Sequence, residues 1–279
     1  MVEAHATSQV YAMLEADILS GRLKPRQRLV ERALEQQLGV SRTPIREALR
    51  QLQYAGMVQA DGARGVVVRD VDVAEAFNLF AVRLPLEKLA IETMSDVTAA
   101  EHQHLRAILD ELDDAFDANN FPRMVALNGQ FHQAMAALSG NDWLVRTLEQ
   151  VRRQCYLVVQ HGPSAERAGL KVSLTDHRKM VHLLMQRDRV ALTALTFEHV
   201  LRSALFFLKR QAIFDPTAEP RANALKAMAE QLQRAPALSL PAIPGLPPRV
   251  VELPRTDRVR VAPAKTGRAR ATAVPNTKR

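Results

Sequence analysis

Two arginines with a spacing suited to reading bases stand in the segment SRTPIREALRQLQYAG, which covers residues 41–56. Arg42 and Arg46 are four residues apart, so a helix through this segment would carry both on one face. A guanidinium group binds guanine through two hydrogen bonds or holds a phosphate, and an α-helix fits the major groove of B-DNA. Thr43 is placed to add a phosphate or thymine-methyl contact, and Arg50 extends the basic face by one turn. These residue types at this spacing predict contact with double-stranded DNA.

The elements that would position these arginines predict a helix-turn-helix. Residues 31–38 form a short predicted helix that carries Arg32, a candidate contact to the DNA backbone. Gly39 predicts a tight turn, and Ser41 is expected to cap the second helix. An isolated pair of arginines is more often a solvated helix face. Here the glycine turn, the cap and Pro44 in the first turn occur together, which favours DNA binding.

A predicted β-hairpin follows the second helix. Apolar residues at 57–58 and 66–68 flank the turn-forming segment DGARG and predict two strands. Arg64 and Gly65 would lie at the tip of this hairpin, where they could enter a minor groove or touch a phosphate. A hairpin in this position would make the N-terminal part of the chain a winged helix-turn-helix.

The stretch LVERALEQQLGVSRTPIREALRQLQYAGMVQADGARGVVV resembles the DNA-binding domain of GntR-type bacterial regulators. The resemblance covers nearly all of residues 7–69, and its VSRTPIREAL segment is highly specific. Gly62-Ala63 departs from the Pro-Gly that relatives often carry before the wing tip. The resemblance implies that operator DNA is contacted by Arg32, Arg42, Arg46 and Gly65, with Arg50 and Thr43 as further contacts.

Histidines in the later part of the chain could bind a metal ion. Asn128 and His132 are four residues apart, and His177 and His199 stand on two later predicted helices. Three imidazoles and one amide could surround zinc, nickel or manganese in the core of a helical bundle. A buried, hydrogen-bonded histidine is the commoner outcome at any one position. We expect the other five histidines to have such a structural role or none; they are His5, His102, His104, His161 and His182.

The pattern around these histidines resembles the FCD-type ligand-binding domain of the FadR subfamily of GntR regulators. The matching elements are NxxFH at 128–132, SGN at 139–141, His177 and the EH pair at 198–199, within a resemblance spanning 74–214. It implies that Asn128, His132, His177 and His199 hold the metal. Asn128 stands where relatives more often have Asp, which removes one negative charge from the ligand set.

Arg83 matches an arginine that faces the ligand pocket of the FCD family. The resemblance implies that it binds a small carboxylate effector together with the metal. The alternative is a surface ion pair with Glu87, four residues later. Pro85 is expected to kink or restart this helix, and Arg152 and Arg153 are further candidates to line the pocket.

The chain organisation expected from these patterns is mainly α. Residues 1–70 form a winged helix-turn-helix, 71–214 an all-helical bundle like the FCD domain for effector binding and dimerisation, and 215–233 an extra helix. Residues 234–279 carry 10 basic and 2 acidic side chains with many prolines, and predict a disordered basic tail that either adds DNA affinity or only solubilises. Helices are expected at 7–20, 31–38, 41–56, 72–96, 99–117, 121–138, 141–161, 172–187, 189–213 and 217–233.

Composition limits the class of protein. The single cysteine, Cys155, excludes a disulfide framework and a multi-cysteine metal site, which fits a cytoplasmic protein. Without an evident signal peptide or an apolar run near 20 residues, no membrane partner is expected. We expect a homodimeric regulator, a repressor that responds to a small carboxylate. Two alternatives stay open: a metal-dependent hydrolase or isomerase with an appended DNA-binding module, and the same regulator without a metal.

Overall fold

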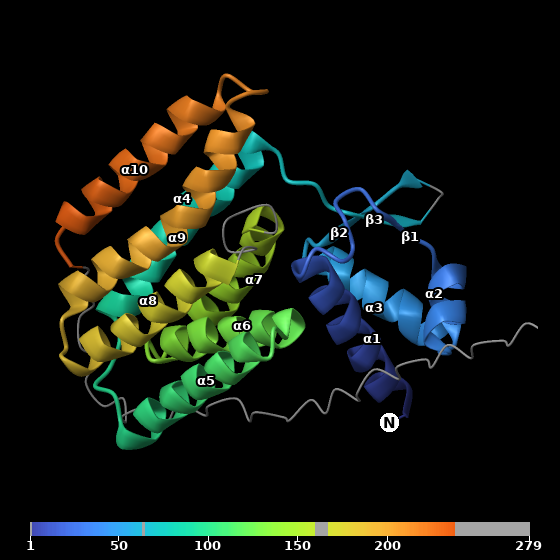
Figure 1. Cartoon of the computed structure of the whole chain (residues 1–279), viewed down its shortest axis with the longest axis horizontal. Helices are drawn as coiled ribbons and strands as arrows, with labels where there is room; N and C mark the ends of the chain where they lie inside the picture. The colour runs from blue at the N-terminus through green and yellow to red at the C-terminus, as the bar shows by residue number, and fades with distance from the viewer. Residues whose placement is uncertain (1, 63–64, 160–166, 238–279) are drawn as a thin grey trace, which may run out of the picture.

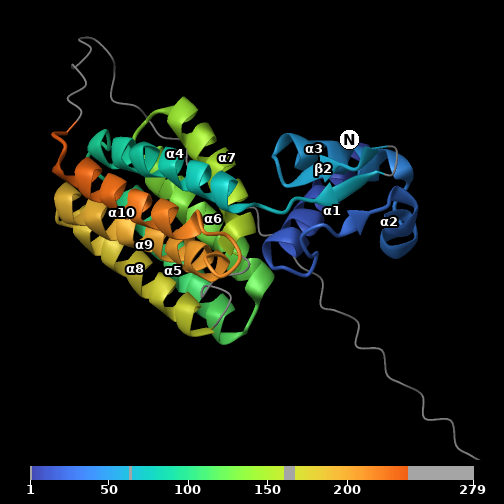
Figure 2. The ribbon, with the colours of Figure 1, turned by 90° about the horizontal axis from the view of Figure 1, so that it is seen from above.

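The structure, a computed structural model, describes residues 2–62, 65–159 and 167–237. Arg64, His161 and the basic tail from residue 238 onward lie outside the described residues. Figures 1 and 2 show a small N-terminal domain, drawn in blue, beside a larger bundle of helices. The chain is mainly α, as the sequence predicts.

The N-terminal domain is built around α1 (Val2–Leu19), α2 (Glu31–Leu38) and α3 (Arg42–Tyr54). Gly39 ends α2 with φ of 65°, a left-handed conformation that glycine adopts without a steric penalty. Ser41 is the N-cap of α3 as predicted, but its side chain makes no capping hydrogen bond. The apolar face of α3 packs against α1, and both helices bury their contacting side chains. These are Ile45, Ala48, Leu49 and Leu52 from α3, and Val10, Leu14 and Ile18 from α1.

The wing is a sheet of three strands, not the predicted two. Strands β2 (Val58–Ala60) and β3 (Val66–Val68) pair as the hairpin, and β1 (Arg28–Leu29) pairs antiparallel with the other edge of β3. Sequence analysis missed β1 because two residues cannot show an alternating pattern. The strand exists only because the free edge of β3 offers it hydrogen-bonding partners.

The described residues after the wing form seven helices. Their bounds lie close to the predicted ones, and α5 coincides with its predicted range of 99–117. Pro85 lies inside α4, which runs as one helix and does not restart there. The helices are α4 (Val73–Glu92), α5 (Ala99–Asp117), α6 (Phe121–Ala137), α7 (Asp142–Val159), α8 (Arg167–Met185), α9 (Arg189–Gln211) and α10 (Ala218–Arg234).

The long helix α9 lies at the centre of this bundle. It packs against α4, α7, α8 and α10, so it is covered on several sides. Within the described part of the chain, α9 is the one helix that is long enough and apolar enough to cross a membrane. Its most apolar window has a mean hydropathy of 1.3. The expectation that no apolar segment approaches this length was therefore wrong. Since 44% of that window is buried inside the bundle, the apolar composition also has a structural explanation as a core helix.

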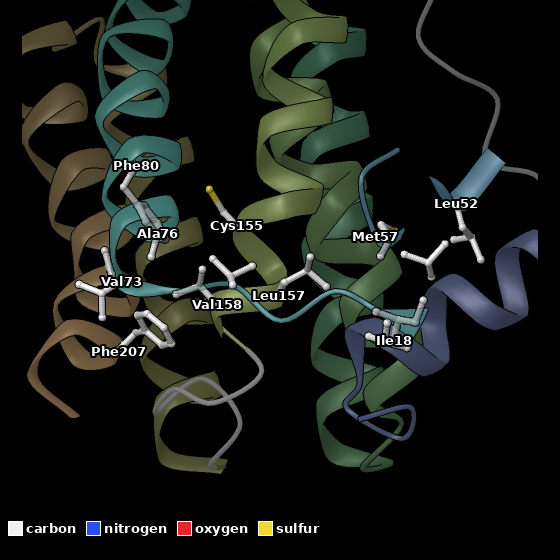
Figure 3. Close-up of a cluster of buried hydrophobic side chains, with 14 of the residues drawn as sticks. Ile18, Leu52, Met57, Val73, Ala76, Phe80, Cys155, Leu157, Val158 and Phe207 are labelled. Carbon is white, nitrogen blue, oxygen red and sulfur yellow. The ribbon is translucent and has the colours of Figure 1, made fainter. Parts of the chain in front are cut away.

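The two parts of the chain share a continuous apolar core. Ile18, Leu52 and Met57 of the N-terminal part belong to the same buried cluster as Leu157 and Val158 of α7 (Figure 3). Helix α1 packs against α6 and α7. The division of the chain at residue 70 stays a prediction, and these contacts place the N-terminal helices directly on the bundle.

Candidate DNA-binding and metal sites

The predicted DNA contacts that the structure describes are all exposed. Arg42 and Arg46 lie on α3 with 57% and 64% of their side chains exposed, and Thr43 and Arg50 are exposed on the same helix. Arg32 is exposed on α2. Gly65 is exposed before β3, with φ of 103°. This surface is open to a large partner.

Glutamates of α2 hold the two central arginines. The Arg42 Nε donates a hydrogen bond of 2.9 Å to Glu35 Oε2. Arg46 binds Glu31 with two parallel bonds, from Nε to Oε1 at 3.1 Å and from Nη2 to Oε2 at 3.0 Å. The hydrogen bonds from Arg46 lower the pKa of Glu31, so this carboxyl is charged at neutral pH. Sequence analysis missed both glutamates, although their i, i+4 spacing on α2 was visible.

Three histidines meet inside the bundle. His132 of α6, His177 of α8 and His199 of α9 each offer a ring nitrogen, and these atoms lie within 4.8 Å of one another. His132 and His177 are buried, and Phe131 stacks on the His177 ring with centroids 4.4 Å apart. Burial lowers the pKa of all three imidazoles, so they are neutral at pH 7. Neutral imidazole is the form that binds metal ions.

His177 provides the test of whether this cluster fits a metal. Both of its ring nitrogens are buried, and neither has a hydrogen-bond partner among the described residues. A buried polar atom without a partner is costly and calls for an unseen ion or water. The donor set therefore fits a divalent cation. Asn128 lies one turn before His132 on α6 and is partly buried, and it stays a predicted ligand.

Asp176 supports this cluster from behind. Its Oδ2 lies 3.2 Å from His199 Nδ1 and accepts a 2.6 Å hydrogen bond from Arg202 Nη1. Burial alone would raise the pKa of Asp176, but the hydrogen bonds from His199 and Arg202 outweigh it and lower the pKa. A carboxylate on one ring nitrogen orients an imidazole and leaves the other nitrogen for a metal. Sequence analysis missed Asp176, whose signal was its position directly before His177.

Arg83 is buried in an ion-pair network beside the histidines. Its Nε donates a 3.0 Å hydrogen bond to Glu87 Oε1. The expected pair with Glu87 therefore forms, but it is buried and not on the surface, and the effector role of Arg83 stays a prediction. Arg152 binds the same carboxylate through Nε at 3.1 Å and Nη2 at 2.8 Å. Burial would raise the pKa of Glu87, but the two guanidinium groups outweigh it and lower the pKa to about 2. Arg152 also donates a 2.9 Å hydrogen bond to the backbone oxygen of His132, which connects the ion-pair network to the candidate metal site.

Comparison with known proteins identifies both parts. Residues 6–68 match the family of bacterial regulatory proteins called the gntR family, and residues 78–202 match the FCD domain. This chain belongs to the GntR family and carries an FCD domain. The three histidines, Arg83 and Arg152 all lie within the FCD match, whereas α10 lies beyond it.

Similar proteins are regulators as well. The chain is 32% identical over 147 residues to the HTH-type transcriptional regulator YdhC of Bacillus subtilis. The match covers 51% of this chain and 65% of YdhC. It is 27% identical over 183 residues to the Nta operon transcriptional regulator of Aminobacter aminovorans, covering 65% of this chain and 85% of that protein. The fold matches Escherichia coli McbR with a TM-score of 0.64 at 23% identity, over 74% of this chain and 98% of McbR. The chain is therefore a bacterial transcriptional regulator of the GntR type.

In this GntR regulator, consecutive residues of α7 face the two functional regions. Arg152 reaches into the FCD domain, as described above. Its neighbour Arg153 binds Tyr11 and Glu15 of α1, the latter at 3.2 Å. Gln154 accepts a 3.4 Å hydrogen bond from Arg69, just after the wing. Of the two candidates for lining the pocket, Arg152 lies at the site, whereas Arg153 contacts the DNA-binding domain.

Proposed function

We propose that this regulator binds operator DNA as a homodimer through α3, and that a metal and a small carboxylate in the FCD domain modulate binding. The main support is that the protein combines a helix with exposed arginines, α3, and a cluster of three neutral histidines inside the bundle. A twofold operator requires two recognition helices, which a dimer supplies. A cytoplasmic location follows from this role. Repression is the simpler direction of regulation, because a bound dimer covers its DNA without a further contact surface.

The α2–α3 surface is the proposed DNA-reading element. Arg42 and Arg46 would contact bases, with Thr43 and Arg50 as further contacts and Arg32 on the backbone. Gly65 at the wing, together with Arg64 outside the described residues, would contact the adjacent groove. Their exposure on short, well-packed helices supports this assignment.

His132, His177 and His199 would hold the metal, with Asn128 as the fourth protein ligand. Zinc, nickel and manganese all accept such ligands. When bound, the metal supplies positive charge and open coordination positions for a carboxylate. Asp176 orients His199 from the outer side.

The charges around this site favour an anionic effector. Arg83 and Arg152 carry two positive charges and share the single negative charge of Glu87, which leaves one positive charge uncompensated beside the neutral histidines. An anion bound beside these arginines would neutralise that charge in a region of low dielectric. This arrangement supports a small carboxylic acid as the effector. Arg83 would then act from within an ion-pair network instead of as a free arginine.

Helix α7 is the proposed connection between effector and DNA. Arg152 contacts the backbone of His132, and Arg153 contacts α1, which packs directly on α3. An effector that favours one position of α7 would therefore favour one placement of the DNA-binding domain. Only a difference in affinity between two such placements would change operator binding.

The experiment that tests this function begins with selection of preferred duplexes from a random DNA library by the full-length protein. Arg46→Ala is then expected to weaken binding to a selected duplex by roughly 5- to 150-fold, the range for one bidentate guanine contact. The fold should be retained because this side chain is exposed, and circular dichroism checks that. Arg178→Ala, an exposed arginine of α8, is the matched control and should bind normally. Equal affinity of Arg46→Ala and the wild type would refute the assignment of α3.

A further inference from the structure

The acidic residues of α2 point to a role that the DNA-binding assignment of α3 leaves out. Glu31 and Glu35 lie on one face of α2, and each binds one arginine of α3. Both carboxylates are 36% exposed, so they lie at the surface where DNA would approach. Any DNA phosphate near this surface competes with a carboxylate for the same guanidinium groups.

The hydrogen-bond pattern determines what each arginine can still offer. Arg46 uses Nε and Nη2 for Glu31, which is the same paired edge that a guanidinium presents to guanine or phosphate. Arg42 uses only Nε for Glu35, so its two terminal nitrogens keep donors that can turn toward DNA. Arg46 is therefore the more strongly occupied of the two.

Charge adds to this competition. Residues 1–70 contain 10 basic and 8 acidic side chains, so the domain that would bind DNA is only weakly positive. Non-specific binding comes from neutralising phosphates, and it strengthens with each additional free cation. Two arginines held by carboxylates contribute little to such binding.

We propose that Glu31 and Glu35 are specificity-determining residues that weaken binding to non-operator DNA by competing with phosphate for Arg46 and Arg42. The inference rests on the proposed role of α3 in DNA recognition. An exposed ion pair is weak because water screens it. A correct bidentate contact to guanine replaces the carboxylate fully, whereas a single phosphate contact replaces it only in part. The glutamates therefore reduce binding to mixed-sequence DNA more than binding to the preferred sequence.

The test uses the full-length protein and two DNA probes, a mixed-sequence duplex and a duplex selected by the wild type. Glu31→Gln, Glu35→Gln and the double variant keep side-chain size and remove the charge. Each single variant is expected to bind the mixed duplex about two- to five-fold more tightly, the range for one exposed ion pair. Affinity for the selected duplex should change by less than about two-fold, so the ratio of the two affinities falls. The salt dependence on mixed DNA should steepen by about 0.9 in log–log slope for each arginine that gains a phosphate.

Asp70→Asn is the matched control, because Asp70 pairs with Arg26 at 2.7 Å in the same part of the chain but away from α3. It removes one negative charge and should leave the affinity ratio unchanged. The inference is overturned if Asp70→Asn lowers the ratio as much as Glu31→Gln does, or if the glutamine variants bind mixed DNA no more tightly. It is equally overturned if they lose affinity only for the selected duplex, because the glutamates would then orient the arginines. If the wild type selects no preferred sequence, the proposed function itself fails, which is a separate outcome.

Discussion

Arginine–glutamate pairs occur in both functional regions of this regulator, but their surroundings are opposite. At the α2–α3 surface, the side chains of Arg46 and Glu31 are 64% and 36% exposed. In the FCD domain, those of Arg152 and Glu87 are only 7% and 5% exposed. Both sets have the same two-bond geometry. Similar pairs therefore serve different purposes according to the water around them.

The exposed and buried pairs differ in the cost of removing one of the two charged side chains. At the surface, water or DNA replaces the lost partner, so the pair can be exchanged at little cost. In the core, water cannot take the place of the lost partner, so removing one side chain leaves the other charge buried without compensation. The arginines of the DNA-binding surface can therefore exchange partners, whereas those beside the histidines keep theirs.

Glu87→Gln should produce the largest effect. The substitution leaves the buried guanidinium groups of Arg83 and Arg152 without a counter-charge, and the free energy of unfolding should fall by about 3–5 kcal/mol. Urea denaturation followed by circular dichroism measures the loss. The control is Asp113→Asn, which removes the exposed partner of Arg178 in the same domain and should cost below about 1 kcal/mol. Equal losses in the two variants would remove the contrast between buried and exposed pairs.

Acid should weaken the buried network in a defined pH range. The pKa of Glu87 is lowered from 4.5 to about 2, so its stabilising contribution is complete above about 4.5 and is lost as the pH falls toward 2. A shift of that size corresponds to about 3 kcal/mol. The stability difference between wild type and Glu87→Gln should therefore shrink by about that amount between pH 5 and pH 2. A difference that stays constant over this range would show that the charge of Glu87 is not what stabilises the network.

Divalent metal should stabilise the protein through the three histidines. A ligand that binds only the folded state at 100 times its dissociation constant adds about 2.7 kcal/mol, so zinc, nickel or manganese should raise the melting temperature and a chelator should reverse it. His177→Ala should abolish the increase. His182→Ala, an exposed histidine on the same helix, should retain it. An identical metal response in all three proteins, purified without a histidine tag, would exclude this cluster as the site.

Arg153→Gln should give the smallest change. This arginine is 32% exposed and joins α7 to α1, so its loss should lower overall stability by less than about 1 kcal/mol. Hydrogen exchange should nevertheless become faster in α1, because the helix loses a contact with the bundle. Arg146→Gln, at an exposed position of α7, should leave exchange in α1 unchanged. Unaltered exchange in Arg153→Gln would show that α7 does not connect the two regions through this residue.

Sequence reasoning predicted elements well where a local pattern existed. The helical period identified each helix that the described part of the chain contains, with α2 and α5 at their observed bounds, because a repeat of 3.6 residues shows in consecutive side chains. It missed β1, which is too short to carry a pattern and depends on a partner strand distant in sequence. Of the two outcomes expected at Pro85, a restart of the helix does not occur, because α4 runs through this residue.

Local patterns along the chain were enough to predict the helix-turn-helix and the family resemblance, and that resemblance implied which histidines come together. The helix-turn-helix rests on residue types at fixed local spacing, which a helix converts directly into faces. The three histidines are 45 and 22 residues apart, so only the resemblance grouped them. The partners of these residues depend on how the helices pack: Glu31 holds Arg46, Asp176 supports His199, and Arg152 binds Glu87. The last case requires α4 and α7, 65 residues apart along the chain, to pack side by side. The contact between Arg152 and Glu87 arises from the packing of two helices distant in sequence and leaves no spacing signal.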